Sequence, residues 1–121
     1  TLRDLKPKKV LCIFGCGGDR DKSKRPLMAK AAEHLADQII ITSDNPRTEN
    51  SDKILDDIEI GFTDRSKVTR IADRRSAIAQ GIRILKSGEV LLIAGKGHED
   101  YQIIGTEKIH FDDRLVAKEY L

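Results

Sequence analysis

The stretch VLCIFGCGG, residues 10–18, decides the fold. Its first five residues are all apolar, which predicts a short strand buried on both faces. Glycines at three of the next four positions end the strand and open a loop. A doubly buried strand is typical of a parallel sheet that helices cover on both faces.

The segments downstream alternate between helix and strand. Pro26 suits the first turn of a helix that places Leu27, Ala31 and Leu35 on one face. Strands are predicted at residues 39–41, 68–72 and 90–94, and the last of these, VLLIA, is the clearest buried strand. The helices predicted between them begin after capping residues, Ser51 and Asp73.

The fold class follows from this alternation. Two short β-like runs at residues 102–104 and 108–110 predict a hairpin, and Asp112 can cap a final helix. We therefore expect an α/β, Rossmann-like fold: a mostly parallel sheet with helices on both faces and a hairpin at one edge. Three polar loops, residues 15–25, 42–50 and 95–100, follow the carboxyl ends of predicted strands, which is where open α/β sheets bind ligands.

Length and composition argue against several classes of protein. The chain has 121 residues, enough for one domain with a core. Its net charge is only +2 and aromatic residues are 4%, so no nucleic-acid partner is expected. No apolar run approaches the roughly 20 residues of a membrane-spanning helix, and no secretory signal opens the chain. Cys12 and Cys16 offer no disulfide framework, which favours the reducing cytoplasm.

The first loop fits neither common phosphate-binding motif. In a dinucleotide-binding G-x-G-x-x-G, Gly15 and Gly17 match, but Arg20 occupies the third glycine position. A G-x-x-x-x-G-K-[ST] loop fails because no glycine precedes Lys22. A solvated charged loop is the common alternative, whereas cations and glycines at a strand end suit the binding of an anion.

The third loop, GKGHED at residues 95–100, also combines glycines with charge. Taken alone, His98 and Glu99 are typical of a solvated loop. Glycines at a strand end nevertheless allow close approach of the backbone, whose carbonyl can accept a hydrogen bond from an ammonium group.

Together, four segments resemble the C-terminal domain of the Mur ligases, in particular the members that add meso-diaminopimelate. They are FGCGGDRDKSKRPLM (14–28), SDNPRTE (43–49), AGKGHEDYQ (94–102) and FDDR (111–114). The resemblance runs from about Lys9 onward. Ser23 stands where the family usually has glycine, and Ala29 and Lys30 also depart slightly.

The resemblance implies an ATP-dependent amide ligase of three domains that acts in peptidoglycan precursor synthesis. ATP phosphorylates the D-glutamyl carboxylate of a UDP-N-acetylmuramoyl dipeptide, and the amine of diaminopimelate then attacks the acyl phosphate. The central domain holds ATP and Mg²⁺, while the C-terminal domain brings the amino acid. The chain starts beyond the strand and helix with which the family's C-terminal domain usually opens. We therefore expect a fragment that lacks the N-terminal and central domains and is inactive alone.

The resemblance also implies that the DNPR turn, Asp44, Asn45, Pro46 and Arg47, selects diaminopimelate. This amino acid is lysine with an additional carboxylate at its far end. A guanidinium is always charged, and its planar fork donates two parallel hydrogen bonds to a carboxylate. Pro46 stiffens the turn, so that Arg47 is held in place.

Further roles are implied by the same resemblance. Arg20 is the second cation on the amino acid, Asn45 and Glu99 meet its ammonium, and Gly95 offers a backbone carbonyl. Asp19 with Lys22 or Lys24 faces the ATP side. His98 positions its loop, and no residue of this chain is expected to be catalytic or to bind a metal.

Two alternatives remain open. One is a stand-alone Rossmann-type nucleotide-binding module without ligase chemistry. The other is a Mur ligase paralogue that adds lysine, for which an arginine directed at a distal carboxylate has no use.

Overall fold

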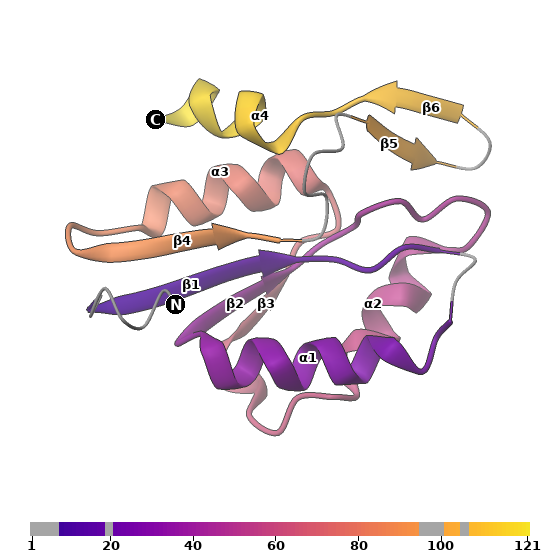
Figure 1. Cartoon of the computed structure of the whole chain (residues 1–121), viewed down its shortest axis with the longest axis horizontal. Helices are drawn as coiled ribbons and strands as arrows, with labels where there is room; N and C mark the ends of the chain where they lie inside the picture. Colours follow the sequence, from indigo (N-terminus) through magenta and orange to yellow (C-terminus); the bar gives the residue numbers. More distant parts are fainter. Residues whose placement is uncertain (1–7, 19–20, 95–100, 105–106) are drawn as a thin grey trace.

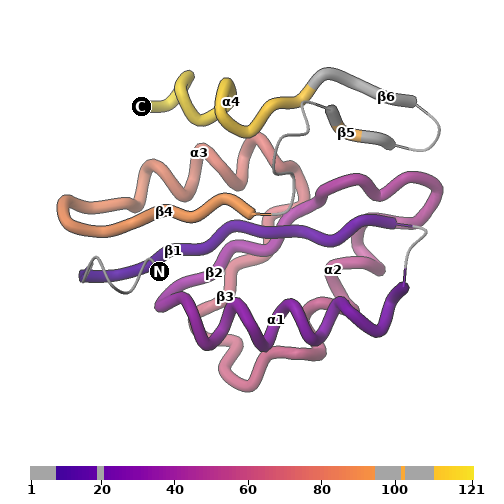
Figure 2. The backbone as a smooth tube through the Cα atoms, in the orientation of Figure 1, coloured from indigo at the N-terminus to yellow at the C-terminus, as the bar shows by residue number. Residues whose placement is uncertain are grey.

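The computed structural model describes residues 8–18, 21–94, 101–104 and 107–121. Figures 1 and 2 show the course of the chain. Its elements in chain order are β1 (Lys9–Phe14), α1 (Lys24–Leu35), β2 (Gln38–Ile41), α2 (Ser51–Glu59), the 3₁₀ helix η2 (Arg65–Lys67), β3 (Val68–Arg70), α3 (Arg74–Ile84), β4 (Glu89–Ile93), β5 (Tyr101–Ile104), β6 (Glu107–His110) and α4 (Asp113–Tyr120).

The main sheet has four strands in the order β3-β2-β1-β4. Each pair of adjacent strands in this sheet is parallel, so the carboxyl ends of the strands lie at one edge. Helices α1 and α2 cover one face, and α3 and α4 lie over the other (Figure 1). The predicted α/β class, with its parallel sheet and two helical layers, is confirmed.

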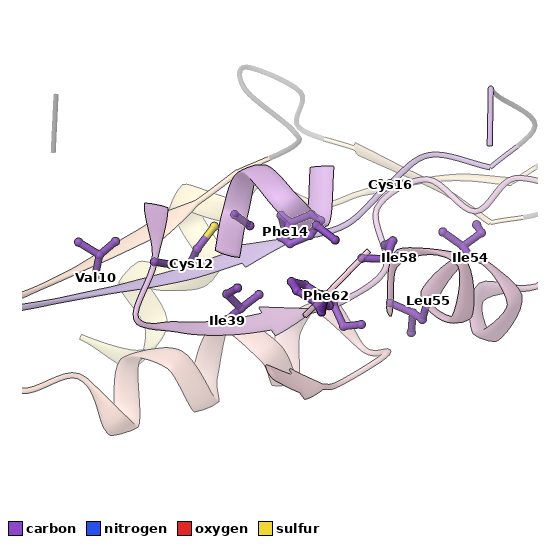
Figure 3. Close-up of a cluster of buried hydrophobic side chains, with 13 residues drawn as sticks. Val10, Cys12, Phe14, Cys16, Ile39, Ile54, Leu55, Ile58 and Phe62 are labelled. Atoms are coloured by element: carbon purple, nitrogen blue, oxygen red, sulfur yellow. The ribbon is translucent and has the colours of Figure 1, made fainter. Parts of the chain in front are cut away.

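Alternating side chains of β1 supply both halves of the core. Val10, Cys12 and Phe14 pack with α1 and α2, in the cluster drawn in Figure 3. Leu11 and Ile13 point to the other face, where they pack with α3 and α4. This explains the unbroken apolar run, because a strand with helices on both sides has no face for polar residues.

The predicted burial of residues 90–94 is wrong in degree. Strand β4 lies at an edge of the four-stranded sheet, and each of its residues is only half-buried. Its apolar composition reflects contact with both core clusters, through Leu92 on one face and Leu91 and Ile93 on the other. Composition reports such contacts but not the position of a strand within its sheet.

The predicted hairpin forms, but as a sheet of its own. Strands β5 and β6 pair antiparallel in a separate two-stranded sheet and do not extend the main one. The side-chain amide of Gln102 in β5 donates to the carbonyl of Asp44, at 2.7 Å, and to the hydroxyl of Ser43, at 3.1 Å. Side-chain hydrogen bonds thus attach the hairpin to the loop after β2.

Helix α1 buries a different face from the predicted one. Leu27 is 61% exposed and Ala31 is exposed, whereas Arg25, Ala29 and Ala32 are buried. Close packing against the end of α2 explains the choice of small residues: a Cβ on Gly61 would lie only 2.8 Å from the Cβ of Ala29. A leucine in place of Ala29 would not fit against Gly61.

Capping residues start the other helices. Asp73 and Asp112 accept backbone hydrogen bonds at the starts of α3 and α4, as predicted. The cap of α2 is Asn50, one residue before the predicted Ser51, and its side chain accepts from the amides of Asp52 and Lys53. Within the described part of the chain, no helix is long and apolar enough to cross a membrane.

We predict slow reaction of both cysteines in the native chain. Cys12 and Cys16 are buried free thiols, and burial raises the pKa of each from 9.0 to about 11. At pH 8 their reaction with a disulfide reagent should be about 100-fold slower than in the unfolded chain, because only the thiolate reacts. Time courses with and without denaturant measure this difference, and equal rates would contradict the burial.

The same pKa shifts predict the sign of a stability change. Between about pH 9 and about pH 11 the unfolded thiols lose protons that the native thiols keep. The free energy of unfolding should therefore fall as the pH rises through this range. A variant with both cysteines replaced by alanine is the control, and its decline should be shallower.

Candidate functional site

A cavity of about 450 Å³ opens at the carboxyl ends of β1 and β2. The loops that follow these two strands leave the sheet at the same edge, as Figure 2 shows. The cavity is lined by Gly15, Cys16, Gly17, Asp21, Lys24, Arg25, Met28, Asp44, Asn45 and Arg47. It is the place where the sequence predicts a ligand, at the edge used by open α/β sheets.

The two loops touch through their backbones. The amide of Gly18 donates to the carbonyl of Asn45 at 2.7 Å. A Cβ on Gly18 would lie 1.8 Å from the carbonyl oxygen of Pro46, and one on Gly15 would lie 2.3 Å from that of Thr42. Neither position has room for a side chain. The glycines of the first loop therefore let it lie directly against the DNPR turn.

Arg47 is held in an unusual conformation over this cavity. Its φ of 53° lies in the left-handed region, which costs a non-glycine residue energy and persists only where the surroundings impose it. Its Nη1 donates to the carbonyl of Gly18 at 3.1 Å and to that of Asn45 at 3.3 Å. Both bonds use the same nitrogen, and the guanidinium is thereby fixed in orientation. In addition to the stiffness expected from Pro46, the hydrogen bond to Gly18 holds the Arg47 side chain against the first loop.

The side chain of Arg25 connects the same two loops through hydrogen bonds. It is 1% exposed, and it donates to both carboxylate oxygens of Glu49, to Asp57 of α2, and to the carbonyl of Gly17. The hydrogen bond with Glu49 contributes most to raising its pKa above the usual value. These partners compensate the buried charge. Arg25 therefore fastens the first loop to the loop after β2.

Sequence reasoning missed this role of Arg25. In the sequence, Arg25 is only one of several cations in a charged loop. Its partners lie 24 and 32 residues away, so no local pattern identifies them. The usable signal was its position directly before Pro26, at the start of a helix, where its side chain is placed beside the strand ends.

The remaining charges around the cavity have mixed sign. Lys24 and Arg47 are cationic, and Asp21 and Asp44 are acidic. A hydrogen bond from the Ser23 hydroxyl lowers the pKa of Asp21 below its usual range, so that its carboxylate stays ionised. A cavity lined by both cations and anions suits a small zwitterion such as an amino acid.

The structure brings together part of the predicted site. Asp44, Asn45 and Pro46 are buried, and Asp44, Asn45 and Arg47 line the cavity together with Lys24. Lys22 is exposed, with its Nζ 4.0 Å from Glu49. The other predicted residues lie outside the described residues: Asp19, Arg20, Gly95, His98 and Glu99.

Metal chemistry has no support in the described residues. Among them, no group of three or more His, Cys, Asp or Glu side chains is placed to hold a metal ion. Cys16 lines the cavity, but its Sγ lies 3.5 Å from Met28 Sδ and its thiol is protonated at neutral pH.

Comparison with known proteins identifies the family of this chain. Residues 1–97 match the family described as "Mur ligase, glutamate ligase domain". The chain is 56% identical over its full length to a UDP-N-acetylmuramoyl-L-alanyl-D-glutamate–2,6-diaminopimelate ligase of Thermosynechococcus vestitus, of which it covers 24%. It is 57% identical over 98% of its length to ligase 2 of the same description from Clostridium acetobutylicum, covering 25% of that protein.

A solved structure gives the same result. The structure of a ligase of the same description superposes with a TM-score of 0.91 at 41% identity, over 98% of this chain and 26% of that one. The chain thus spans about a quarter of the length of these relatives. By its sequence and its fold, this chain belongs to the Mur ligase family and contains that family's glutamate ligase domain.

Proposed function

We propose that this chain is the amino-acid-binding domain of an ATP-dependent ligase that adds meso-diaminopimelate to UDP-N-acetylmuramoyl-L-alanyl-D-glutamate. The observation that carries the proposal is the tethered guanidinium of Arg47, which borders the cavity beside Asp44 and Asn45. The relatives that share more than half of their aligned residues with this chain are described as ligases of this substrate pair.

The distal carboxylate of diaminopimelate is the group that Arg47 recognises. Because its Nη1 is bound to Gly18 and Asn45, the orientation of the fork is set before the ligand arrives. A preoriented guanidinium pairs well with a planar carboxylate. Lysine has no group to offer at this point, and it would leave Arg47 without its anionic partner.

The other predicted residues complete the proposal. Arg20 is the second cation on the amino acid, Asn45 and Glu99 meet its ammonium, and the carbonyl of Gly95 accepts from it. The chain orients the attacking amine, and none of its side chains is assigned as a base.

ATP and Mg²⁺ are assigned to a central domain outside these residues. The 121 residues contain no complete phosphate-binding loop, and the described ones show no metal site. Asp19, Lys22 and Lys24 stay the candidates for the side that faces ATP. Since Lys24 lines the same cavity as Arg47, the two substrates would approach one another here. We place the ligase in the cytoplasm, in agreement with its free cysteines.

Binding and specificity measurements separate this proposal from the alternatives. Tight dinucleotide binding by the isolated chain would favour a nucleotide-binding module. Preference for lysine over diaminopimelate in the full-length ligase would favour the lysine-adding paralogue.

Arg47→Ala should strongly reduce use of diaminopimelate in the full-length ligase. Removing one partner of a charge pair that the bound ligand shields from water costs about 2–5 kcal/mol. Arg47→Lys should recover little, because a single ammonium cannot reproduce the fork. The measurement is kcat/KM for diaminopimelate and for lysine in the wild type and both variants. Use of lysine should fall much less. An equal decrease for both amino acids would show that Arg47 does not select.

Gly18→Ala should weaken the selection without touching the ligand. Its Cβ would overlap the carbonyl of Pro46, so the two loops must separate and Arg47 loses its tether. We expect the diaminopimelate-to-lysine ratio of kcat/KM to fall about tenfold or more. Gly88→Ala is the control, since φ is 85° at Gly88 and the strain there lies far from the cavity. A selection ratio as low in the control as in Gly18→Ala would refute the role of the tether.

Glu99→Gln should raise the KM for diaminopimelate more than that for ATP. A charge-assisted hydrogen bond is worth about 1.5–3 kcal/mol, which corresponds to roughly a tenfold or larger rise. Steady-state kinetics with each substrate varied in turn measure both constants. A selective rise of the KM for ATP would place Glu99 on the nucleotide side.

A further inference from the structure

Arg74 is a second fully buried cation at the carboxyl edge of the sheet, at the first position of α3. Its Nε and Nη2 donate to the two carboxylate oxygens of Asp113, at 2.8 and 2.7 Å. Its Nη1 donates to the carbonyl of Ser43 at 3.1 Å, and Nη2 donates also to the carbonyl of Ala94 at 3.2 Å. One planar group therefore binds three separate segments.

Two of these segments lead directly into the proposed amino-acid site. Ser43 immediately precedes the DNPR turn, and Ala94 immediately precedes the third loop, which carries Gly95 and Glu99. The strands before these loops, β2 and β4, are not neighbours, because β1 lies between them. The hydrogen bonds of the sheet connect the ends of β2 and β4 only indirectly, through β1. Arg74 connects them directly.

The carbonyl of Ser43 is part of a short segment restrained from several sides. The Ser43 hydroxyl donates to the carbonyl of Ala72 at 2.7 Å, and Gln102 donates to both Ser43 and Asp44. Asp113 starts α4, so its bidentate pair with Arg74 also fastens the C-terminal helix to these strand ends. The backbone that leads into Arg47 thus has little freedom to shift.

We propose that Arg74 is a positioning residue: it sets the separation between Ser43 and Ala94, after which the DNPR turn and residues 95–100 continue the chain, and with it the fit of the amino acid. The proposal rests on the proposed function of these loops. A guanidinium is suited to the task because its N–H groups point outward in fixed directions and reach both carbonyls and the carboxylate at once. A lysine ammonium is a single point and cannot span the same partners.

Arg74→Lys in the full-length ligase tests this role. The KM for the amino acid should rise about tenfold or more, since small misplacement of binding groups is costly. The KM for ATP should stay within about twofold, and kcat at saturating amino acid should change far less than KM. A purely structural role predicts the opposite: a smaller fraction of folded enzyme lowers kcat and leaves both KM values unchanged.

Arg75→Lys is the matched control. Arg75 is the next residue of the same helix, is partly exposed, and pairs with Glu119 instead of with the strand ends. Its KM values should equal those of the wild type. If Arg74→Lys also leaves the amino-acid KM unchanged, the proposal is wrong.

A second variant covers failure to fold. Should Arg74→Lys not fold, Asp113→Asn keeps Arg74 but weakens the bond that orients its fork. It should raise the amino-acid KM in the same direction by a smaller factor, and an unchanged value overturns the proposal. The wild type is assayed first with diaminopimelate and with lysine. If it uses another amino acid, the proposed function fails, while the role of Arg74 is tested with the amino acid that it accepts.

Discussion

Parallel hydrogen bonding of β1 to both β2 and β4 is the constraint on which the rest of this structure depends. The pairing runs from Lys9 to Ile13 on one side and from Leu11 to Phe14 on the other. With both edges paired and helices on both faces, β1 is enclosed in the core. Parallel pairing also requires that the adjoining strands end at the same edge. The strand ends at Phe14, Ile41 and Ile93 therefore lie at the same edge of the sheet.

At that edge the backbone carbonyls beyond the strands lose their partners in the sheet, and polar side chains of the site replace them. A backbone carbonyl just beyond the end of a strand needs another hydrogen-bond donor if it is shielded from water. Here Arg25 donates to Gly17, Arg47 to Gly18, and Gln102 to Asp44. Long polar side chains supply these bonds because they reach from neighbouring elements into the space between the strand ends. The interactions that satisfy the backbone also shape the cavity.

Buried cations in turn need carboxylates. Arg25 has Glu49 and Asp57, and Arg74 has Asp113. Breaking such a pair leaves a buried charge without compensation, at a cost of about 3–5 kcal/mol. Stability and ligand recognition are therefore coupled at this edge. A substitution in one of these ion pairs should change both the free energy of unfolding and the affinity for the ligand.

Most of the fold was predictable because it depends on local patterns. Apolar runs identified β1 and β2, and capping residues placed the starts of α3 and α4 within a residue. The DNPR turn was recognisable because its residue types are close together in sequence. Burial was less predictable: Leu27 is exposed although it follows the helical period, because the packed face of α1 instead carries Arg25, Ala29 and Ala32, and Gly61 approaches Ala29 closely.

The sequence by itself determined the order of elements, the parallel α/β class and the identity of the turn that carries Arg47. Each of these depends on residues within a few positions of one another, whose spacing restricts the backbone directly. Only the tertiary structure decided that β4 is an edge strand, that the hairpin forms its own sheet, and that Arg25 pairs with Glu49 and Asp57. These features depend on which distant segments meet in space. A buried charge accepts whichever carboxylate the packing brings within reach, and local periodicity contains no record of that choice.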